Sequence, residues 1–181
     1  MKVEVKFAKV KEGAIIPSKR DEDMGFDIYS CFEEDYIIIM PHETKLIPTG
    51  IASACDPGYG FVLFERGSTG SKGIARRCGI IDSGYRNEWF VGLTNTTDRW
   101  LIISKVDAQD IIIAESKDTN IKRAIDIEMH IDNAIIYPYS KAIVQALVLP
   151  VYDSKVEELS YDELKNIKSE RGMGALGSSN K

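Results

Sequence analysis

The sequence has no excess of positive charge. It contains 23 lysines and arginines against 28 aspartates and glutamates, which gives a formal net charge of −5 and a pI near 5.2. Proteins that bind long nucleic acid usually carry a basic stripe and have a high pI. We therefore expect no long nucleic acid as a partner, and any polyanionic substrate must be met by locally placed arginines and lysines.

Long apolar runs and paired cysteines are also missing. No run approaches the roughly twenty apolar residues that cross a bilayer, and residues 1–10 alternate charged and apolar side chains, unlike the apolar core of a signal peptide. Cys31, Cys55 and Cys78 form no C-x-x-C pair, and only two histidines could join them in a zinc site. We expect reduced thiols, no membrane partner and a cytoplasmic location.

The chain does contain a series of short segments with a period of two residues, which is typical of strands. Its 181 residues, 44% of them hydrophobic, can form a core without a disulfide or a metal. Strand-like segments lie at residues 3–7, 36–40, 58–65, 89–95 and 142–151, and we expect the last to be buried on both faces. This pattern predicts an all-β sandwich or barrel.

One stretch near the C-terminus argues well for a helix. Ser160 and Glu163 have the spacing of a capping box, which predicts a short helix over Tyr161–Lys168. Residues 169–181 are rich in glycine and serine, and we expect them to be mobile when nothing holds them. The sequence thus suggests a barrel domain over residues 1–159, followed by a short helix and a glycine-rich arm over residues 160–181.

Residues 96–133 contain three weaker strand-like runs, separated by aspartate, serine, lysine and asparagine. The clearest alternates apolar and polar residues from Ile125 to Asp132. We expect one or two hairpins inserted into the sheet architecture, because this segment is too small to bury a core alone.

Two glycine-rich segments resemble nucleotide-binding motifs without matching them. Gly172, Gly174 and Gly177 fit G-x-G-x-x-G, but no strand–helix unit surrounds them, and residues 67–73 do not have Walker A spacing. Either segment could still bind phosphate through main-chain N–H groups. The alternative interpretations are an ordinary turn and a floppy tail.

Five segments in a fixed order carry a family resemblance. They resemble the five motifs of the homotrimeric dUTPase family, the deoxyuridine triphosphate nucleotidohydrolases. The segments are MGFDI at 24–28, PGYG at 57–60 with ERGSTG at 65–70, GIIDSGYRNE at 79–88, IVQA at 143–146, and RGMGALGSS at 171–179. The resemblance implies a jelly-roll-like β-barrel, a homotrimer with active sites shared among three chains, and hydrolysis of dUTP to dUMP and pyrophosphate with Mg²⁺.

The resemblance also implies a role for individual residues. Asp82 would activate water for attack on the α-phosphate, and Tyr85 would pack on the deoxyribose and exclude a 2′-hydroxyl. The hairpin of Gly79, Ile80 and Ile81 would read uracil through main-chain groups. From the residues alone, Asp82 is better interpreted as a turn aspartate before Ser83 and Gly84, and Tyr85 could be an ordinary strand aromatic.

Further residues would bind the triphosphate. Asp27 would contact Mg²⁺ through water, since the metal of this family is held by the triphosphate and water, and the C-terminal arm would close as a lid. The implied phosphate-binding residues are Arg66, Gly67, Ser68, Thr69 and Gln145 in the barrel, and Arg171, Gly174, Leu176, Gly177 and Ser178 in the arm. Without the motifs, Arg66 could form a surface ion pair, Asp27 a turn, and Gln145 a buried amide.

The chain departs from the family pattern at several positions. Gly67 replaces a serine, Leu176 replaces an aromatic residue that stacks on the base, Ala142 replaces an arginine, and Asn87 replaces a glycine. Leucine forgoes a stacking contribution of roughly 0.5–1.5 kcal/mol. We therefore expect weaker lid closure and a lower rate, not inactivity.

Two alternatives remain open at this point. The related dCTP deaminases typically carry a tryptophan at the position of Tyr85 and a catalytic glutamate three residues before an asparagine, where this chain has Gly92 before Asn95. A catalytically weak regulatory binding protein of the same fold is the second. Some bacteriophage dUTPases carry an insertion where this chain has residues 96–133, so a phage origin, a bacterial host cytoplasm and a regulatory protein partner are plausible by analogy.

Overall fold

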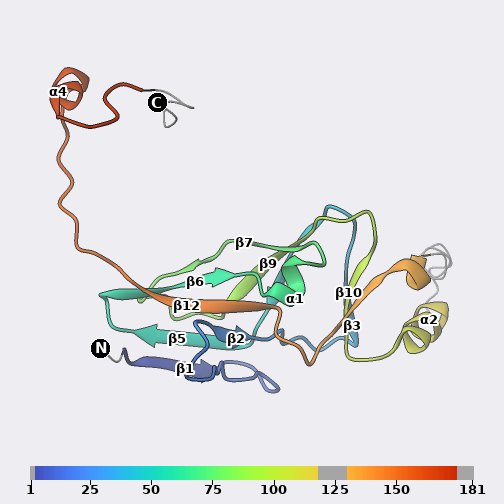
Figure 1. Cartoon of the computed structure of the whole chain (residues 1–181). Coiled ribbons are helices and arrows are strands. Elements are labelled where there is room, and N and C mark those ends of the chain that lie inside the picture. The colour runs from blue at the N-terminus through green and yellow to red at the C-terminus, as the bar shows by residue number, and fades with distance from the viewer. Residues whose placement is uncertain (1–2, 118–129, 175–181) are drawn as a thin grey trace. The chain divides into compact units, whose positions relative to one another are not determined.

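The computed structural model describes the backbone of residues 3–117 and 130–174, and side chains outside 113–117 within those ranges (Figure 1). The chain divides into two compact units, residues 1–151 and residues 152–181, which are described separately. The second unit begins earlier than the suggested boundary at residue 160. Among the described residues, no helix has the length and apolar character needed to cross a bilayer.

The first unit consists mainly of strands, as the sequence predicts. The described strands form four sheets, with the orders β1-β5, β11-β10-β3, β2-β12-β6-β8 and β4-β9-β7. The strands are β1 (Val5–Lys9), β2 (Phe26–Ile28), β3 (Tyr36–Ile39), β4 (Thr44–Pro48), β5 (Ile51–Cys55), β6 (Tyr59–Phe64), β7 (Ile74–Arg77), β8 (Ile80–Ile81), β9 (Phe90–Asn95), β10 (Leu101–Ser104), β11 (Ile135–Pro138) and β12 (Val144–Pro150). The helices are α1 (Gly67–Gly70), α2 (Ala108–Lys117), the 3-10 turn η1 (Ile131–Asn133) and α4 (Tyr161–Asn166).

An aromatic cluster occupies the main core. The rings of Phe61 and Trp89, both fully buried, meet edge to face with centroids 5.0 Å apart. Phe7 of β1 packs on both, at 5.6 Å from Phe61 and 5.7 Å from Trp89. Edge-to-face pairs stabilise a core by about 0.5–1.5 kcal/mol beyond the area they bury, so this cluster ties β1 and β6 to the start of β9.

Strand β12 is only partly buried, which corrects the expectation of burial on both faces. Val144 and Ala146 are buried between β2 and β6, but Leu149 is 38% exposed. On the neighbouring strands, Phe64 is also 38% exposed and Ile80 is 74% exposed. This sheet therefore presents exposed apolar side chains along its length in a single chain.

The segment between residues 96 and 133 does not form the expected hairpins in its described part. β10 pairs antiparallel with β3 but parallel with β11, and α2 lies between β10 and β11 in the sequence, so the connection is a strand–helix–strand crossover. Asp107 caps α2, because its Oδ1 accepts the N–H of Asp110 at 3.0 Å. Residues 131–133 form η1 instead of a strand, and residues 125–129 lie outside the described residues.

The crossover has a small apolar cluster of its own. The sheet β11-β10-β3 faces the main core with one side, through residues such as Leu101 and Ile103. Its other side carries the second cluster, in which Trp100 and Ile102 pack with Ile111 of α2. Helix α2 therefore covers the outer face of this sheet (Figure 1), and all four residues of β10 are buried as a result.

The predicted helix near the C-terminus is confirmed as α4. Ser160 Oγ accepts the N–H of Glu163 at 3.2 Å, and Glu163 Oε2 accepts the N–H of Ser160 at 2.8 Å. The hydrogen bond from the Ser160 side chain lowers the pKa of Glu163. The helix ends at Asn166, before the expected Lys168.

Candidate active site

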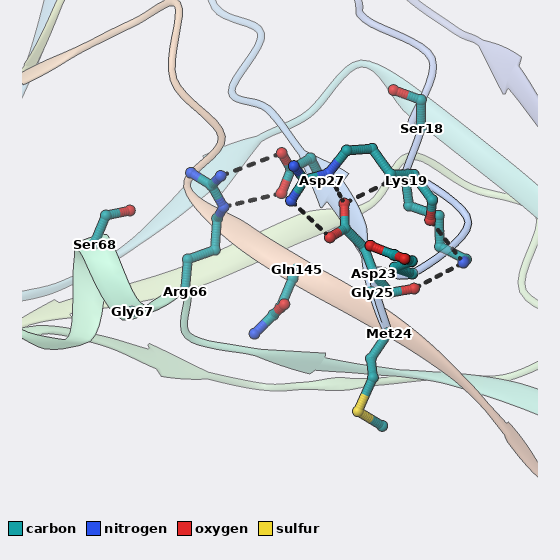
Figure 2. A pocket seen from close by; sticks show the side chains of 12 residues that line it. Ser18, Lys19, Asp23, Met24, Gly25, Asp27, Arg66, Gly67, Ser68 and Gln145 are labelled. Atoms are coloured by element: carbon teal, nitrogen blue, oxygen red, sulfur yellow. Dashed lines mark hydrogen bonds and ion pairs between the residues drawn. The ribbon is translucent and has the colours of Figure 1, made fainter.

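A pocket of about 850 Å³ brings together several residues that lie far apart in the sequence. It is lined by Asp27 on β2, Arg66, Gly67 and Ser68 around the start of α1, and Gln145 on β12. The remaining lining residues come from the loop before β2. In Figure 2 these side chains surround one hollow, with the side chain of Arg66 extending toward Asp27 and that of Gln145 lying beside them.

Arg66 and Asp27 form a two-point ion pair at the centre of the pocket. Arg66 Nε lies 2.9 Å from Asp27 Oδ1, and Nη2 donates to Oδ2 at 3.2 Å. Nη1 donates to the carbonyl of Ala142 at 3.2 Å, which fixes the plane of the guanidinium. Both side chains remain about one-third exposed, at 29% and 34%, so an incoming anion can reach them.

The turn of α1 presents Gly67 and Ser68 but not the hydroxyl of Thr69. Thr69 is 1% exposed, and its Oγ1 accepts the N–H of Arg66 and donates to the Arg66 carbonyl, each at 3.0 Å. Thr69 therefore shapes the turn, whereas Gly67 and Ser68 line the pocket. A Cβ at Gly67 would meet nothing within 4 Å, so its replacement of the family serine leaves open space.

Gln145 is held in place from two sides. Its Nε2 donates to the carbonyl of Glu65 at 2.9 Å, and Gly25 packs against its other side. A Cβ at Gly25 would lie 3.1 Å from both Cβ and Oε1 of Gln145, tighter than ordinary contacts. Packing therefore explains why the MGFDI segment has a glycine at position 25, since a larger residue would displace Gln145.

Glu65 connects this pocket to β7. Its Oε1 accepts the main-chain N–H of Arg76 at 2.8 Å, and this hydrogen bond lowers the pKa of Glu65 below its usual range. The carboxylate thus satisfies a donor on the edge strand of the β4-β9-β7 sheet.

A second arginine–aspartate pair, which sequence reasoning missed, lies in the loop before β2. Arg20 Nε and Nη2 each contact the Asp23 carboxylate at 2.9 Å, and Lys19 Nζ donates to the Asp23 carbonyl at 2.7 Å. These interactions raise the pKa of Arg20 and lower that of Asp23. The sequence feature that could have indicated this pair is the charged run at residues 19–23, which places Lys19 and Arg20 directly before the MGFDI motif.

The residues expected to read the base lie elsewhere in the chain. β8 pairs with β6 through Ile80 and Ile81, and the Gly79 carbonyl accepts the N–H of Leu63 at 2.7 Å. Ile81 is 7% exposed and Ile80 74%. In the order β2-β12-β6-β8, β8 and β2 form opposite edges of one sheet, so this hairpin and Asp27 lie at opposite edges.

Asp82 and Tyr85 follow β8 in an exposed turn. The N–H of Tyr85 donates to the Asp82 carbonyl at 3.0 Å, and the Tyr85 hydroxyl donates to the Glu88 carbonyl at 3.1 Å. The Asp82 residue is exposed and Tyr85 is 38% exposed. Neither lines the Arg66 pocket of the same chain.

The arm residues belong to the second unit and are described by themselves. Arg171 Nε donates to the Gly174 carbonyl at 3.2 Å. Leu176, Gly177 and Ser178 lie outside the described residues.

The pocket contains carboxylates but no protein cage for a metal ion. In the parts of the chain that the structure describes, no group of three histidine, cysteine, aspartate or glutamate side chains could hold a metal. Asp27 and Asp23 line the pocket, each paired with an arginine. A carboxylate of this kind can still accept a hydrogen bond from metal-bound water, so the donor set fits a cation that arrives with its own ligands.

Fold and pocket together define a class: an all-β barrel with a polar pocket in which Arg66 pairs with Asp27 beside Gln145. A dUTPase family model matches residues 11–135. The chain is 32% identical to the deoxyuridine 5'-triphosphate nucleotidohydrolase of Nautilia profundicola, covering 99% of this chain and 100% of that protein, and 30% identical to that of Clostridioides difficile, covering 96% of each. The chain belongs to the dUTPase family.

A solved structure supports the same fold. The Staphylococcus bacteriophage 80alpha dUTPase with dUpNHpp superposes with a TM-score of 0.69 at 19% identity, covering 98% of this chain and 99% of that one. The barrel is therefore of the jelly-roll type, as the resemblance implied.

Proposed function

We propose that this protein hydrolyses dUTP to dUMP and pyrophosphate. The observation that carries the proposal is the family match over residues 11–135, which includes Asp27 and Arg66 of the pocket and the Asp82 turn. Two relatives that match this chain over 96% or more of their own length are named deoxyuridine 5'-triphosphate nucleotidohydrolases. The pocket also has the chemistry that a triphosphate requires, namely an oriented guanidinium, a hydroxyl and a side-chain amide.

In the reaction, Asp82 orients a water molecule and accepts its proton. The water oxygen forms a bond to the α-phosphorus, the bond from that phosphorus to the bridging oxygen breaks, and pyrophosphate leaves. Phosphoryl chemistry of this type depends mainly on positioning and on neutralising charge. Arg66, Ser68 and Gln145 supply part of both by binding phosphate oxygens.

The base is selected by the hairpin of Gly79, Ile80 and Ile81. Main-chain groups that match uracil face the wrong donor and acceptor when cytosine is present. Each buried group left unpaired costs roughly 1–3 kcal/mol. Tyr85 packs on the deoxyribose and excludes a 2′-hydroxyl by its bulk.

Asp27 would hold a water ligand of a Mg²⁺ ion bound with the triphosphate. That ion would supply neutralisation of phosphate charge. Arg66 then exchanges part of its pairing with Asp27 for phosphate oxygens.

The complete site requires more than one chain, and we propose a homotrimer. Within one chain, the Arg66 pocket and the Asp82 turn lie at opposite edges of the β2-β12-β6-β8 sheet. The exposed apolar residues Phe64, Ile80 and Leu149 on that sheet supply surface for association. The C-terminal arm closes over the triphosphate as a lid, through Arg171, Gly174, Leu176, Gly177 and Ser178. Ordering the backbone of the arm costs about 1–2 kcal/mol per residue, so closure requires bound nucleotide.

Deamination of dCTP is the less favoured activity. The position of the catalytic glutamate in deaminases corresponds to Gly92, where a Cβ would lie 3.2 Å from both Cβ and the carbonyl oxygen of Arg77. Strand β7 therefore approaches β9 too closely there to admit a glutamate without rearrangement.

The test is to incubate the purified full-length chain with each deoxynucleoside triphosphate, with and without Mg²⁺, and to measure pyrophosphate and ammonia. We expect Mg²⁺-dependent pyrophosphate from dUTP alone. Ammonia from dCTP, or no product from dUTP, would overturn the proposal. Sedimentation analysis of the same protein tests the trimer.

By the analogy with bacteriophage dUTPases, a regulatory protein partner would bind through residues 96–133. That partner and a cytoplasmic location stay predictions. Pull-down with and without α2 surface variants would test the first.

A further inference from the structure

Arg76 lies between the two halves of the proposed site. It belongs to β7 in the β4-β9-β7 sheet, whereas Phe64 belongs to β6 in the other large sheet. The Cζ atom of Arg76 lies 5.6 Å from the centroid of the Phe64 ring. The side chain of Arg76 therefore crosses from one sheet to the other.

Gly79 leaves the space into which this side chain fits. A Cβ at Gly79 would lie 2.7 Å from Cζ and 3.1 Å from Cδ of Arg76, and it would clash with Nη1 as well. The Gly79 carbonyl accepts the Leu63 N–H at 2.7 Å. The main chain of Gly79 is thus held between β6 on one side and the guanidinium on the other.

The other end of Arg76 is tied to the phosphate pocket. Its main-chain N–H donates to Glu65 Oε1 at 2.8 Å, and the carbonyl of Glu65 accepts from Gln145 Nε2 at 2.9 Å. A continuous set of contacts therefore runs from Gln145 through Glu65 and Arg76 to Gly79.

The Arg76 side chain is also unusual in its hydrogen bonding. Its Nε is buried and has no hydrogen-bond partner among the residues that the structure describes. An unpaired buried donor is unfavourable. The position of the guanidinium is therefore set by its contacts with Phe64 and Gly79, not by a hydrogen bond at Nε.

We propose that Arg76 is a positioning residue for base recognition. Its guanidinium, stacked between the Phe64 ring and the Gly79 main chain, fixes the hairpin of residues 79–81 at the distance from which its N–H and C=O groups read the base. The proposal rests on the proposed dUTPase function, and Arg76 acts through Gly79 without touching the nucleotide. Main-chain N–H and C=O groups can distinguish uracil from cytosine only while their positions are fixed.

The test compares Arg76→Leu with Arg77→Leu in the full-length protein. Leucine keeps apolar contact with Phe64 but removes the guanidinium. Arg77 is the matched control, because it is the next residue of the same strand and is exposed, with its Nε donating to Thr94 Oγ1 at 3.3 Å. The measurements are kcat and KM for dUTP, and the inhibition constants of dCTP and inorganic triphosphate.

We expect Arg76→Leu to lower the ratio of the dCTP inhibition constant to the dUTP KM by about tenfold, mainly by raising KM. Inhibition by triphosphate should change little, because the Arg66 pocket is intact. Arg76→Lys, which keeps a cation, should recover part of the ratio. Arg77→Leu should resemble the wild type in all four quantities.

An unchanged ratio in Arg76→Leu, or an equal fall in Arg77→Leu, would overturn the proposal. A fall in kcat alone would show only a smaller folded fraction and would also count against it. If Arg76→Leu does not fold, Phe64→Leu removes the stacked ring instead and carries the same expectation. A wild-type protein that releases no pyrophosphate from dUTP contradicts the proposed function itself, whereas an active wild type with an unchanged variant ratio contradicts only the role of Arg76.

Discussion

The two halves of the proposed site are built differently within one chain. The Arg66 pocket is held by contacts among distant segments, including the two-point pair with Asp27 and the hydrogen bond between Gln145 and Glu65. The Asp82 turn is exposed, and Tyr85 forms local hydrogen bonds there, with the carbonyls of Asp82 and Glu88. A single chain thus orders the proposed phosphate half through distant contacts, whereas the proposed catalytic half is exposed in one chain.

The largest effect should come from the exposed half. In Asp82→Asn the amide cannot accept the proton of water, and we expect kcat to fall by about 10³-fold. Binding of dUpNHpp should stay close to that of the wild type, because the phosphate pocket is untouched. Pyrophosphate release and calorimetric titration measure the two quantities.

Asp35→Asn is the control for that substitution, since Asp35 is an exposed carboxylate in the loop before β3. It should leave both quantities unchanged. Turnover of Asp82→Asn equal to that of the wild type would remove Asp82 from its assigned role.

The next largest effect should come from the centre of the preformed half. Arg66→Gln loses a charge-assisted contact to phosphate worth about 1.5–3 kcal/mol, so we expect affinity for dUpNHpp to fall by roughly 10–100-fold. Arg20→Gln should cause a much smaller loss, because the Arg20 side chain is 88% exposed and its pair with Asp23 is screened by water. Calorimetry at two salt concentrations compares the variants, and similar losses would show that the two pairs are equivalent.

A smaller effect should follow from crowding the same half. Gly25→Ala places a methyl group 3.1 Å from Gln145 Oε1, so Gln145 must shift by a few tenths of an ångström, and we expect kcat/KM to fall by about tenfold. Gly60→Ala is the control, because its new Cβ would meet the nearest atom, the Ile81 carbonyl oxygen, at 3.5 Å, an ordinary contact. Steady-state kinetics measure kcat/KM for both variants. An equal fall in kcat/KM in Gly25→Ala and Gly60→Ala would exclude displacement of Gln145 as the cause.

The smallest effect should appear in the pH dependence of stability. The main-chain N–H of Arg76 holds the pKa of Glu65 below its usual range. A lowered folded-state pKa gives stability that is present above the unfolded pKa, near 4.3, and is lost as pH falls through the folded value. We expect the Tm of Glu65→Gln to fall less steeply than that of the wild type between about pH 5 and pH 3.

Glu4→Gln provides the reference for that measurement. Its side chain is 79% exposed and is paired with Lys6, another exposed residue. Its thermal pH profile should follow the wild type. A Glu65→Gln profile parallel to the wild type would contradict the assigned hydrogen bond.

Much of the fold could be predicted from local patterns. The dense β-branched run at residues 36–40 and the Ser160–Glu163 capping box appear in the structure as β3 and α4. Helix α2 was missed because its run of isoleucines reads as a strand, and its burial depends on Trp100 and Ile102, which lie on another element. Tertiary contacts decide such ambiguous apolar runs.

The candidate site was accessible to sequence reasoning only through its motifs. They named Asp27, Arg66 and Gln145, which the structure brings into one pocket. The Arg20–Asp23 pair was missed because an exposed charge run looks like any solvated loop. The inward-facing Thr69 hydroxyl could not be foreseen either, since its partners are main-chain atoms of the same turn.

The strand–helix crossover has a consequence for how this barrel can change over time. Its outer cluster around Trp100 is separate from the main core, and β10 contributes Ile102 to the first and Leu101 and Ile103 to the second. Substitutions on the outer layer therefore leave the packing around Trp89 intact. The surface of the crossover can therefore change during evolution without disturbing the packing of the main core.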